Sequence, residues 1–344
     1  MRSTHEPPQL RHDPLAARTV FVAPDRAGRP NELAGDRLDC PFCAGNEAAT
    51  PPDTLRSPAD ASTPWLARIV PNRFPVVSSS HDPQAGSATG SGGLPARGVH
   101  EVVIESPVHV RSILDVDPRG WHEAWWLVRQ RLAQLAESRR VAWATVFKNS
   151  GSRAGASLAH VHSQLVGLDF APPAIRAEAA ALVADGASSE DGFGRLVTRA
   201  RAEGRCIAEL GGLVALVPPA PRQPFETWIL PVSPEAYLHE AALPRIAALA
   251  DLTRSFVRRL ESLLPDTDFN WWLHQPPFDH EPGCTGLRAA AGWHWHLEIL
   301  PRINGLAGFE LGTGCHITTM CPEESARLLR AALPESTDLP PSPT

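Results

Sequence analysis

The alternation of apolar and polar positions along the chain predicts a mixture of strands and helices. The run Val141-Ala-Trp-Ala-Thr-Val-Phe147 is apolar and rich in β-branched and aromatic residues, which is typical of a buried strand. Residues 118–140 instead place apolar side chains at helical spacing, on a face that carries Trp121, Trp125, Leu132 and Leu135. These patterns indicate an α+β protein, and 344 residues are enough for two domains of ordinary size.

The order of these patterns occurs a second time further along the chain. Residues 243–264 repeat the helical pattern of residues 118–140, after a stretch of helical linker sequence. Residues 269–301 then give two strands, and the second of them carries a His-x-His motif like one in the first half. The repeated order predicts an internal duplication, with one domain over residues 1–170 and a second over residues 205–332.

A polar stretch follows the buried strand of the first half and is the strongest candidate for chemistry. It reads Asn149-Ser-Gly-Ser-Arg-Ala-Gly-Ala-Ser-Leu-Ala-His160-Val-His162-Ser-Gln164. We expect His160, His162 and Gln164 to share one face of a strand, because strand side chains repeat every two residues. A loop of small residues rich in free N–H groups, beside two imidazoles and a carboxamide, suits a phosphate group. The alternative is the one-sided polarity of an edge strand.

A Cys-x-x-Cys motif lies near the beginning of the chain, in Asp39-Cys-Pro-Phe-Cys-Ala-Gly-Asn-Glu47. Two thiolates that flank a tight turn converge on one ion, so Cys40 and Cys43 predict a zinc site. A redox pair is the alternative, but no thioredoxin-like βαβ pattern surrounds the motif. Six cysteines in so long a chain are too few for a disulfide framework.

The charge and hydropathy of the whole chain exclude several classes of protein. The formal net charge is −6 and the pI is about 6.2, which argues against a partner such as nucleic acid or a membrane surface. No apolar run approaches the length of a transmembrane helix, and residues 1–6 have no apolar core typical of a signal peptide. We therefore expect a cytoplasmic protein.

The polar stretch and the cysteine motif together resemble a known family. His-x-His-x-Gln after a Gly-Ala-Ser loop, with Cys-Pro-Phe-Cys-x-Gly-Asn-Glu, resembles the galactose-1-phosphate uridylyltransferases, the transferase branch of the histidine-triad superfamily. The chain is also similar to the related ADP-glucose phosphorylases. The resemblance implies a duplicated histidine-triad-like α+β fold with two antiparallel sheets and packed helices, assembled as a homodimer. The first domain would carry the nucleophile and the zinc, and the second would be a degenerate copy.

The resemblance also implies roles for individual residues. His162 would be the nucleophile and Gln164 would bind phosphoryl oxygens, with Ser157, Asn149 and the loop N–H groups beside them. Arg26 and Arg29 would face the nucleotide phosphates, although solvated surface charges are the alternative, and Asn72 would lie near the base or ribose. The zinc site would be completed by His109 and His160, which join Cys40 and Cys43.

A second metal, zinc or iron, is expected in the second half. His274, His294 and His296 suit such an ion, and the resemblance to the uridylyltransferases adds Glu178 as a carboxylate ligand. ADP-glucose phosphorylases instead place a second Cys-x-x-Cys before the second repeat, where this chain has Cys206, Glu209 and, downstream, His239. Buried histidines without a metal are the third alternative.

The activity implied is a ping-pong exchange of UMP between UDP-glucose and galactose-1-phosphate, through a uridylyl-histidine intermediate. The partners are then a nucleoside diphosphate sugar and a sugar-1-phosphate. An ADP-glucose phosphorylase-like adenylyltransferase is the main alternative, because residues 305–315 resemble the tail of that family. A nucleotide hydrolase is disfavoured by Gln164, since hydrolases of the superfamily have His there. A zinc-stabilised nucleotide-binding protein without catalysis is the remaining alternative.

Overall fold

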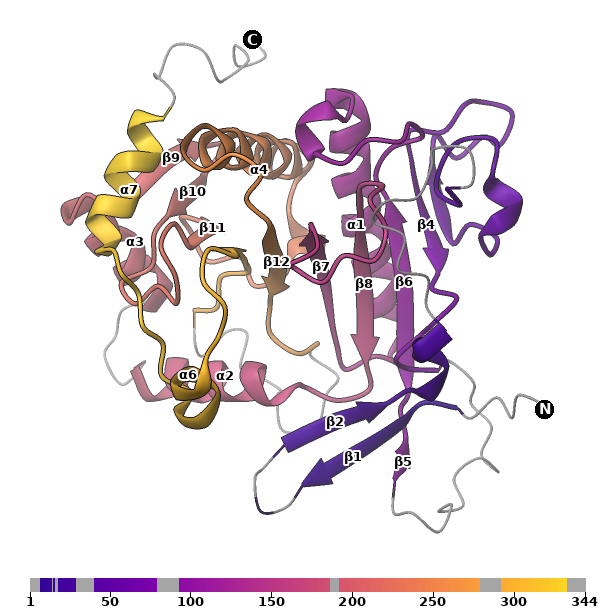
Figure 1. The fold of residues 1–344 in the computed structure, drawn as a ribbon, viewed down its shortest axis with the longest axis horizontal. Helices are drawn as coiled ribbons and strands as arrows, with labels where there is room; N and C mark the ends of the chain where they lie inside the picture. Colours follow the sequence, from indigo (N-terminus) through magenta and orange to yellow (C-terminus); the bar gives the residue numbers. More distant parts are fainter. Residues whose placement is uncertain are drawn as a thin grey trace.

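The fold is organised around one large antiparallel sheet that runs through both halves of the chain (Figure 1). The computed structural model describes residues 7–13, 15, 18–28, 40–78, 93–185, 192–278 and 292–332. The large sheet has 10 strands in the order β3-β4-β6-β8-β7-β12-β13-β11-β10-β9. In chain order they are β3 (Leu55–Ser57), β4 (Ala67–Pro71), β6 (Gly98–Ile104), β7 (Trp143–Ser150), β8 (His162–Leu168), β9 (Cys206–Leu210), β10 (Leu213–Leu216), β11 (Thr227–Pro231), β12 (Phe269–His274) and β13 (His296–Pro301).

A small antiparallel sheet of three strands lies beside the large one. Its order is β2-β1-β5, and the strands are β1 (Gln9–Asp13), β2 (Arg18–Val22) and β5 (Leu94–Pro95). Leu10 of β1 is buried and belongs to the same apolar cluster as Trp143 of β7. The predicted α+β class with two antiparallel sheets is therefore confirmed.

The two halves are joined edge to edge at the middle of the large sheet. β7 of the first half pairs with β12 of the second, from Phe269 opposite Ser150 to Trp272 opposite Phe147. The two halves also repeat one pairing: Phe147 lies opposite Gln164, and Trp272 lies opposite Glu298. Both hydrogen-bonding edges of the two central strands are thereby satisfied.

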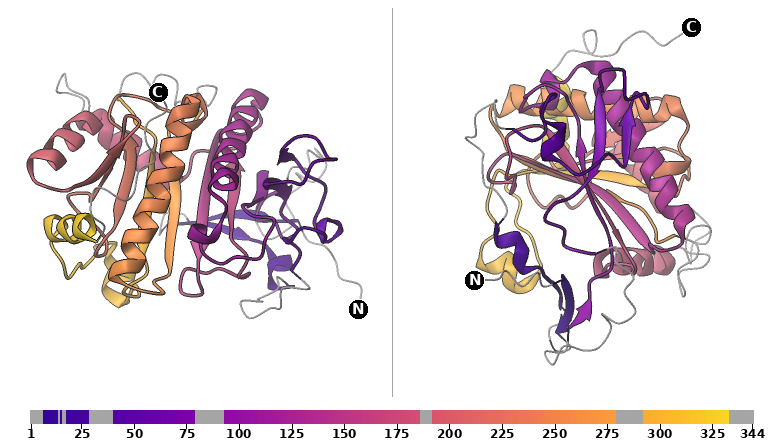
Figure 2. Two further views of the ribbon diagram at one scale, coloured as in Figure 1. Left: turned by 90° about the horizontal axis from the view of Figure 1, so that it is seen from above. Right: turned by 90° about the vertical axis from the view of Figure 1, so that its right-hand side faces the viewer.

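Two long helices cover one face of the sheet side by side, as Figure 2 shows from above. They are α1 (Pro118–Ser138) and α4 (Leu243–Leu263). α1 begins at a proline, and the side chain of Asp117 accepts a hydrogen bond from Gly120 N at 3.0 Å, so its first turn is capped. Trp121 and Trp125 of α1 are buried against the sheet, as their helical spacing predicts.

The opposite face of the sheet is covered at one end by α2 (Pro173–Asp185) and α3 (Gly192–Ala202), the helices of the predicted linker. Side chains alternate between the two faces: Ala215 joins the core under α1 and α4, while Val214 and Leu216 join the core under α2 and α3. Because both faces are covered, β10 is buried along its whole length.

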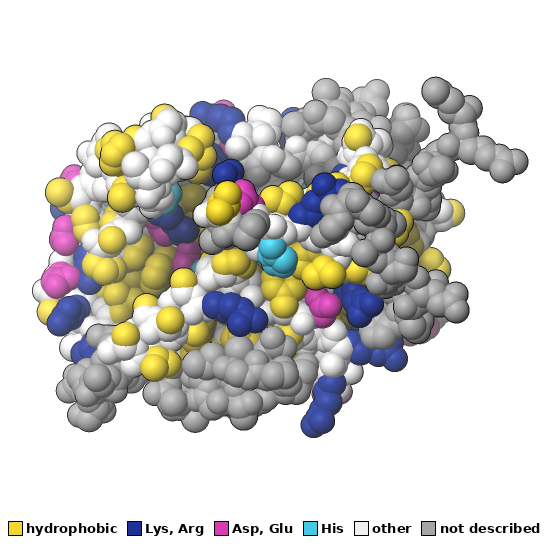
Figure 3. Space-filling view, turned by 90° about the horizontal axis from the view of Figure 1, so that it is seen from below, with side chains coloured by type: hydrophobic (Ala, Val, Ile, Leu, Met, Phe, Trp, Pro, Cys, Tyr) yellow, Lys and Arg dark blue, Asp and Glu magenta, His cyan; other side chains and the backbone are white. Residues whose placement is uncertain are grey.

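Shorter elements complete the chain. Among the described residues the other helices are α6 (Gly308–Thr313) and α7 (Pro322–Ala331), with 3-10 turns at Pro24–Gly28, Glu47–Ala49, Ile113–Asp115 and Leu238–Glu240. α6 lies at the lower end of Figure 1 and exposes Phe309 and Leu311. Figure 3 shows the molecule from this lower side, where apolar side chains are visible between scattered Lys and Arg side chains. Within the described ranges, every helix is too short or too polar to cross a bilayer.

Candidate active site

The candidate nucleophile stands at the first residue of β8. The expectation that His160 shares the strand face with His162 and Gln164 is wrong, because β8 begins only at His162. Immediately before His162 the backbone bonds outside the sheet, because Val161 N donates to Val110 O at 2.8 Å. His160 therefore belongs to a separate cluster, whereas His162 and Gln164 lie on the same face of β8.

The imidazole of His162 is held in one tautomer. Its Nδ1 lies 2.7 Å from the backbone oxygen of His160, and because a carbonyl can only accept, Nδ1 carries the proton. The lone pair is then on Nε2, the tautomer that a histidine nucleophile requires. The side chain is 7% exposed and its ring packs against Phe42, with the ring centroids 5.4 Å apart. Position and tautomer are both fixed by the fold.

The carboxamide of Gln164 is oriented by a histidine that the sequence did not single out. His100 on β6 receives a hydrogen bond at Nδ1 from Val76 N (3.1 Å), so its Nε2 carries the proton. That Nε2 lies 2.9 Å from Gln164 Oε1 and 3.1 Å from Asn72 Nδ2. Because Nδ1 accepts, Nε2 donates to Gln164 Oε1, and the NH₂ group of Gln164 is left as the donor for other partners. The sequence could have pointed to His100 only through strand register, because His100 lies on the strand that pairs with β8.

Two pockets meet at His162. The first, of about 290 Å³, contains the predicted residues Asn72, Ser157 and Gln164 together with apolar and aromatic side chains: Pro41, Phe42, Val70, Phe74, Val102 and Leu158. The second, of about 360 Å³, is bounded by the loop after β7 and contains Asn149, Ser150, Gly151, Ser152 and Ala156. The first suits a flat base or ribose, and the second places the small-residue loop beside the candidate nucleophile.

Of the two arginines predicted to face the nucleotide phosphates, the structure describes Arg26. Arg26 donates from Nη1 to the backbone oxygen of Phe74 at 2.5 Å, so its guanidinium sits against a wall of the first pocket. Arg29 lies outside the described residues. The role of both arginines toward a nucleotide phosphate stays a prediction.

Two residues of the second half form hydrogen bonds with the loop that follows β7 in the first half. Asn270 on β12 donates from Nδ2 to Asn149 Oδ1 (2.8 Å) and to Ala154 O (2.9 Å). Asp268 accepts from Arg153 N at 2.7 Å, and its carboxylate lies so close to Gly151 that a Cβ atom there would be 1.7 Å from Oδ1. No sequence motif marks Asn270 or Asp268, because their partners are more than 100 residues away in the chain.

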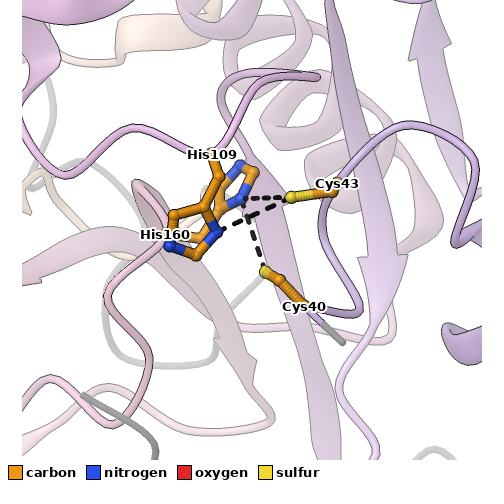
Figure 4. Close-up of side chains that lie close together, drawn as sticks. All are labelled: Cys40, Cys43, His109 and His160. Atoms are coloured by element: carbon orange, nitrogen blue, oxygen red, sulfur yellow. Dashed lines mark hydrogen bonds between the residues drawn. The ribbon is translucent and has the colours of Figure 1, made fainter. Parts of the chain in front are cut away.

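The predicted zinc ligands come together beside the candidate nucleophile (Figure 4). Cys40, Cys43, His109 and His160 place their ligand atoms within 4.8 Å of one another. His160 Nδ1 lies 3.5 Å from Cys40 Sγ and 3.7 Å from Cys43 Sγ, and His109 Nδ1 lies 3.6 Å from Cys43 Sγ. Tetrahedral zinc, with bonds of about 2.3 Å to sulfur and 2.0 Å to nitrogen, separates such ligand atoms by roughly 3.5 Å.

The protonation of His160 also fits a metal ligand. Its Nε2 lies 2.9 Å from Ser106 O and therefore carries the proton, which leaves the lone pair on the Nδ1 that faces the thiols. Burial lowers the pKa of His160 to about 4, although the hydrogen bond to Ser106 opposes the shift, and the ring is neutral at pH 7. Two cysteine sulfurs and two imidazoles are a donor set suited to zinc.

A second candidate metal site connects the linker helix α2 to the second half. Glu178 of α2, His274 of β12 and His296 of β13 place their ligand atoms within 4.8 Å of one another, and His274 Nδ1 lies 2.7 Å from Glu178 Oε2. His296 repeats the geometry of His162, with Nδ1 bonded to His294 O at 3.1 Å. His294 itself is fully buried and stands apart from this cluster, with Nδ1 bonded to Pro231 O.

The position equivalent to Gln164 carries a charge network instead. Glu298 forms ion pairs with Arg222 and His296, and Arg222 also binds Glu226 and covers the ring of Trp272. Burial opposes ionisation of Glu298, but the hydrogen bond with His296 and the charges of His274 and Arg222 outweigh it and lower its pKa to about 2. A carboxylate that is ionised and already paired with arginine disfavours an anionic phosphate at this site.

The chain is similar to known proteins over most of its length. Residues 2–172 match the family model described as galactose-1-phosphate uridyl transferase, N-terminal domain. An ADP-glucose phosphorylase of Arabidopsis thaliana is 31% identical over 341 residues, covering 95% of this chain and 93% of the relative. A galactose-1-phosphate uridylyltransferase of Thermotoga maritima is 25% identical over 331 residues, covering 94% and 98%.

A solved structure extends the comparison to three dimensions. The crystal structure of an ADP-glucose phosphorylase from Arabidopsis thaliana with bound ADP-glucose superposes with a TM-score of 0.76 at 30% identity. The match covers 94% of this chain and 98% of that one. Both halves of the fold are therefore shared with that protein.

Proposed function

This chain belongs to the galactose-1-phosphate uridyl transferase family of nucleotidyltransferases, and we propose that it transfers a nucleotidyl group through His162. The observation that supports this most directly is the hydrogen bond from His162 Nδ1 to the His160 carbonyl. It leaves Nε2 as the basic nitrogen at the meeting point of the two pockets. A neutral, fixed imidazole is what nucleophilic attack on phosphorus needs.

In the first step, Nε2 of His162 attacks the α-phosphorus of a nucleoside diphosphate sugar. The bond from the α-phosphorus to the bridging oxygen breaks, and the sugar-1-phosphate leaves with that oxygen and its electron pair. The NH₂ group of Gln164 and the N–H groups of the loop stabilise the negative charge on the non-bridging oxygens. The product is a nucleotidyl group bonded to His162.

In the second step, a phosphate oxygen of an acceptor attacks the same phosphorus and His162 leaves as neutral imidazole. Gln164 has no ionisable group and cannot take a proton from water, whereas a phosphate acceptor already has a nucleophilic oxygen. We therefore expect the intermediate to persist in water and to react with a phosphate compound. This is a ping-pong transfer rather than a hydrolysis.

For the donor we propose ADP-glucose, with inorganic phosphate as acceptor, so that glucose-1-phosphate and ADP are formed. The support is similarity over the whole chain: 31% identity to an ADP-glucose phosphorylase, against 25% to the uridylyltransferase of Thermotoga maritima. The pocket containing Phe42, Phe74 and Asn72 offers the apolar and amide groups that a nucleoside base needs.

Exchange of UMP between UDP-glucose and galactose-1-phosphate is the second candidate. It is favoured by the cluster of Glu178, His274 and His296, because a carboxylate at that place was expected from the uridylyltransferases. A zinc ion at Cys40, Cys43, His109 and His160 would be structural in either case and would tie residues 40–43 to the nucleophile.

The test is to record the intact mass of the protein after mixing it separately with ADP-glucose and UDP-glucose. We expect an adduct of AMP size with ADP-glucose, which is lost in acid and discharged by inorganic phosphate. A UMP adduct discharged by galactose-1-phosphate would establish the second candidate instead. The absence of any adduct with either sugar would refute covalent transfer and favour the non-catalytic nucleotide-binding protein.

A matched variant links the adduct to the proposed residue. His162→Gly should form no adduct, while its metal content and thermal unfolding stay close to those of the parent. His296→Gly removes the histidine of the same geometry in the second half and should still form the adduct. An adduct on His162→Gly would show that another residue is the nucleophile.

A further inference from the structure

Lys148 is the only lysine in a chain whose Lys and Arg residues total 32. A composition so strongly biased toward arginine suggests that this position requires an ammonium group rather than any cation. The side chain is only 2% exposed, and its Nζ lies 5.5 Å from the ring centroid of Trp271 and 5.9 Å from that of Trp121. A compact ammonium fits between these rings, whereas a planar guanidinium is larger and needs more hydrogen-bond acceptors.

The ammonium of Lys148 reaches the main chain at the nucleophile. Its Nζ donates to the backbone oxygen of His162 at 2.9 Å and forms an ion pair with Glu105. The paired residues of β7 and β8 end at Phe147 opposite Gln164, so His162 lies beyond the last backbone pair. The side chain of Lys148 thus supplies the His162 carbonyl with a hydrogen bond from β7 where that ladder has ended.

Glu105 holds the next residue of the same strand. It follows β6 directly, on the other side of β8, and its Oε1 accepts a hydrogen bond from Ser163 Oγ at 2.5 Å. Lys148 and Glu105 therefore contact the two residues that flank one peptide bond, the carbonyl of His162 and the hydroxyl of Ser163. Together the pair fixes that peptide between β6 and β7.

A buried ion pair is a costly way to stabilise a fold, because both charges lose their hydration, and apolar residues of similar volume often do as well or better. Burial lowers the pKa of Lys148, and the charge of Glu105 opposes that shift. The contacts of the pair are with the nucleophile's own peptide, which points to a role in positioning rather than in stability alone.

We propose that Lys148 and Glu105 are positioning residues that set the orientation of the His162 imidazole by fixing the His162–Ser163 peptide. The inference rests on the proposed role of His162 as nucleophile. The imidazole is then held at two points: Nδ1 by the His160 carbonyl, and the main chain by the buried pair. Loss of the pair should slow attack on phosphorus more than it weakens binding of the donor.

The decisive experiment compares single variants with a neutral double variant. Lys148→Met and Glu105→Gln each leave one buried charge without its partner, so both should unfold at lower temperature and form the adduct slowly. Lys148→Met/Glu105→Gln removes both charges and should recover much of the thermal stability. It still lacks the hydrogen bond to the His162 carbonyl, so its adduct should form about tenfold to a hundredfold more slowly than that of the parent.

Binding is measured separately from chemistry. The dissociation constant of ADP-glucose, measured by calorimetry in a His162→Asn background, should change less than threefold in the double variant. Ser163→Ala removes only the hydroxyl that binds Glu105, so it remains informative if the charged variants fail to fold, and we expect a smaller loss of rate. If the double variant recovers both its stability and the parent rate of adduct formation, the proposal is overturned. If the double variant does not fold, an unchanged rate of adduct formation in Ser163→Ala overturns it instead.

A control separates positioning from general destabilisation. Arg205 is 1% exposed, pairs with the half-exposed Glu203 and donates to the backbone oxygen of Val217 at 2.7 Å, so it is a buried cation bound to a main-chain carbonyl away from the site. Arg205→Met should lose stability but keep the rate of adduct formation per folded molecule. If the parent itself forms no adduct, it is the proposed function that fails; if the parent reacts and the variants react equally fast, only the positioning role fails.

Discussion

Replacing Asn270 with alanine would show whether the second half of the chain holds the loop that follows β7 in the first half. Asn270 is 7% exposed and donates to Asn149 Oδ1 and to Ala154 O, while its Oδ1 accepts from Arg302 Nε at 2.5 Å. In Asn270→Ala these bonds are lost, together with a longer one from Nδ2 to Lys148 O at 3.5 Å, so the loop after β7 loses two of its anchors. We therefore expect effects on both stability and rate.

The expected loss of stability follows from these contacts. A neutral hydrogen bond contributes roughly 1 kcal/mol and one to a charged group about 2 kcal/mol, so Asn270→Ala should cost about 3–4 kcal/mol. Thermal unfolding should then begin roughly 5–10 °C lower. Adduct formation should slow by about tenfold to a hundredfold, because displacement of the loop N–H groups by about 1 Å has effects of that size.

Gln275 provides a matched control at the other end of β12. It is fully buried, and its Nε2 donates to Ala144 O on β7 at 2.9 Å, so it also bridges the two halves, but away from the loop. Gln275→Ala should lose comparable stability while its adduct forms at the parent rate per folded molecule. If Asn270→Ala reacts as fast as Gln275→Ala, the second half does not hold the loop and this reasoning is refuted.

Further variants test the metal sites, the loop and the assembly. Cys40→Ser/Cys43→Ser should lower the zinc content by one ion per chain and cost several kcal/mol of stability; elemental analysis that finds no metal in the freshly purified parent would contradict the zinc site. Glu178→Gln/His274→Ala should remove a second metal and leave the first, and a parent with a single ion would argue against the second site. Gly151→Ala should abolish rapid adduct formation, since its Cβ would overlap Asp268 and its φ of 86° disfavours any side chain; a normal rate would show that the loop tolerates displacement. Light scattering should give twice the chain mass if the predicted homodimer forms, and the single-chain mass would contradict it.

Local sequence patterns were sufficient to predict the two long helices and to identify the side chains that are candidates for chemistry. Helical spacing of apolar residues gave α1 and α4 to within two residues of their ends. The Cys-x-x-Cys motif gave two ligands of one cluster, because two residues between the cysteines already bring the thiols together. The His-x-His-x-Gln order placed His162 and Gln164 on one face, since strand side chains alternate.

The pattern misplaced one residue of the same motif. His160 was expected on the strand face with His162 and also as a zinc ligand with Cys40 and Cys43. Its ring does face the two thiols, but the strand begins only at His162. Alternation applies only within a strand, and the sequence does not show where β8 begins. That boundary is set by Val110, whose carbonyl binds Val161 N from a distant part of the chain.

Contacts between distant segments were decided by the tertiary structure alone. The pairing of β7 with β12 makes one sheet of the two halves and brings Asn270 to the loop at Ala154, 116 residues away. His100 orients Gln164 and Glu105 reaches Ser163 for the same reason, since β6 lies beside β8. The sequence by itself indicated which side chains are candidates for chemistry, because spacing along a strand or turn is a local property. The tertiary structure decided the tautomers, orientations and supports of those groups, because they depend on which strands become neighbours.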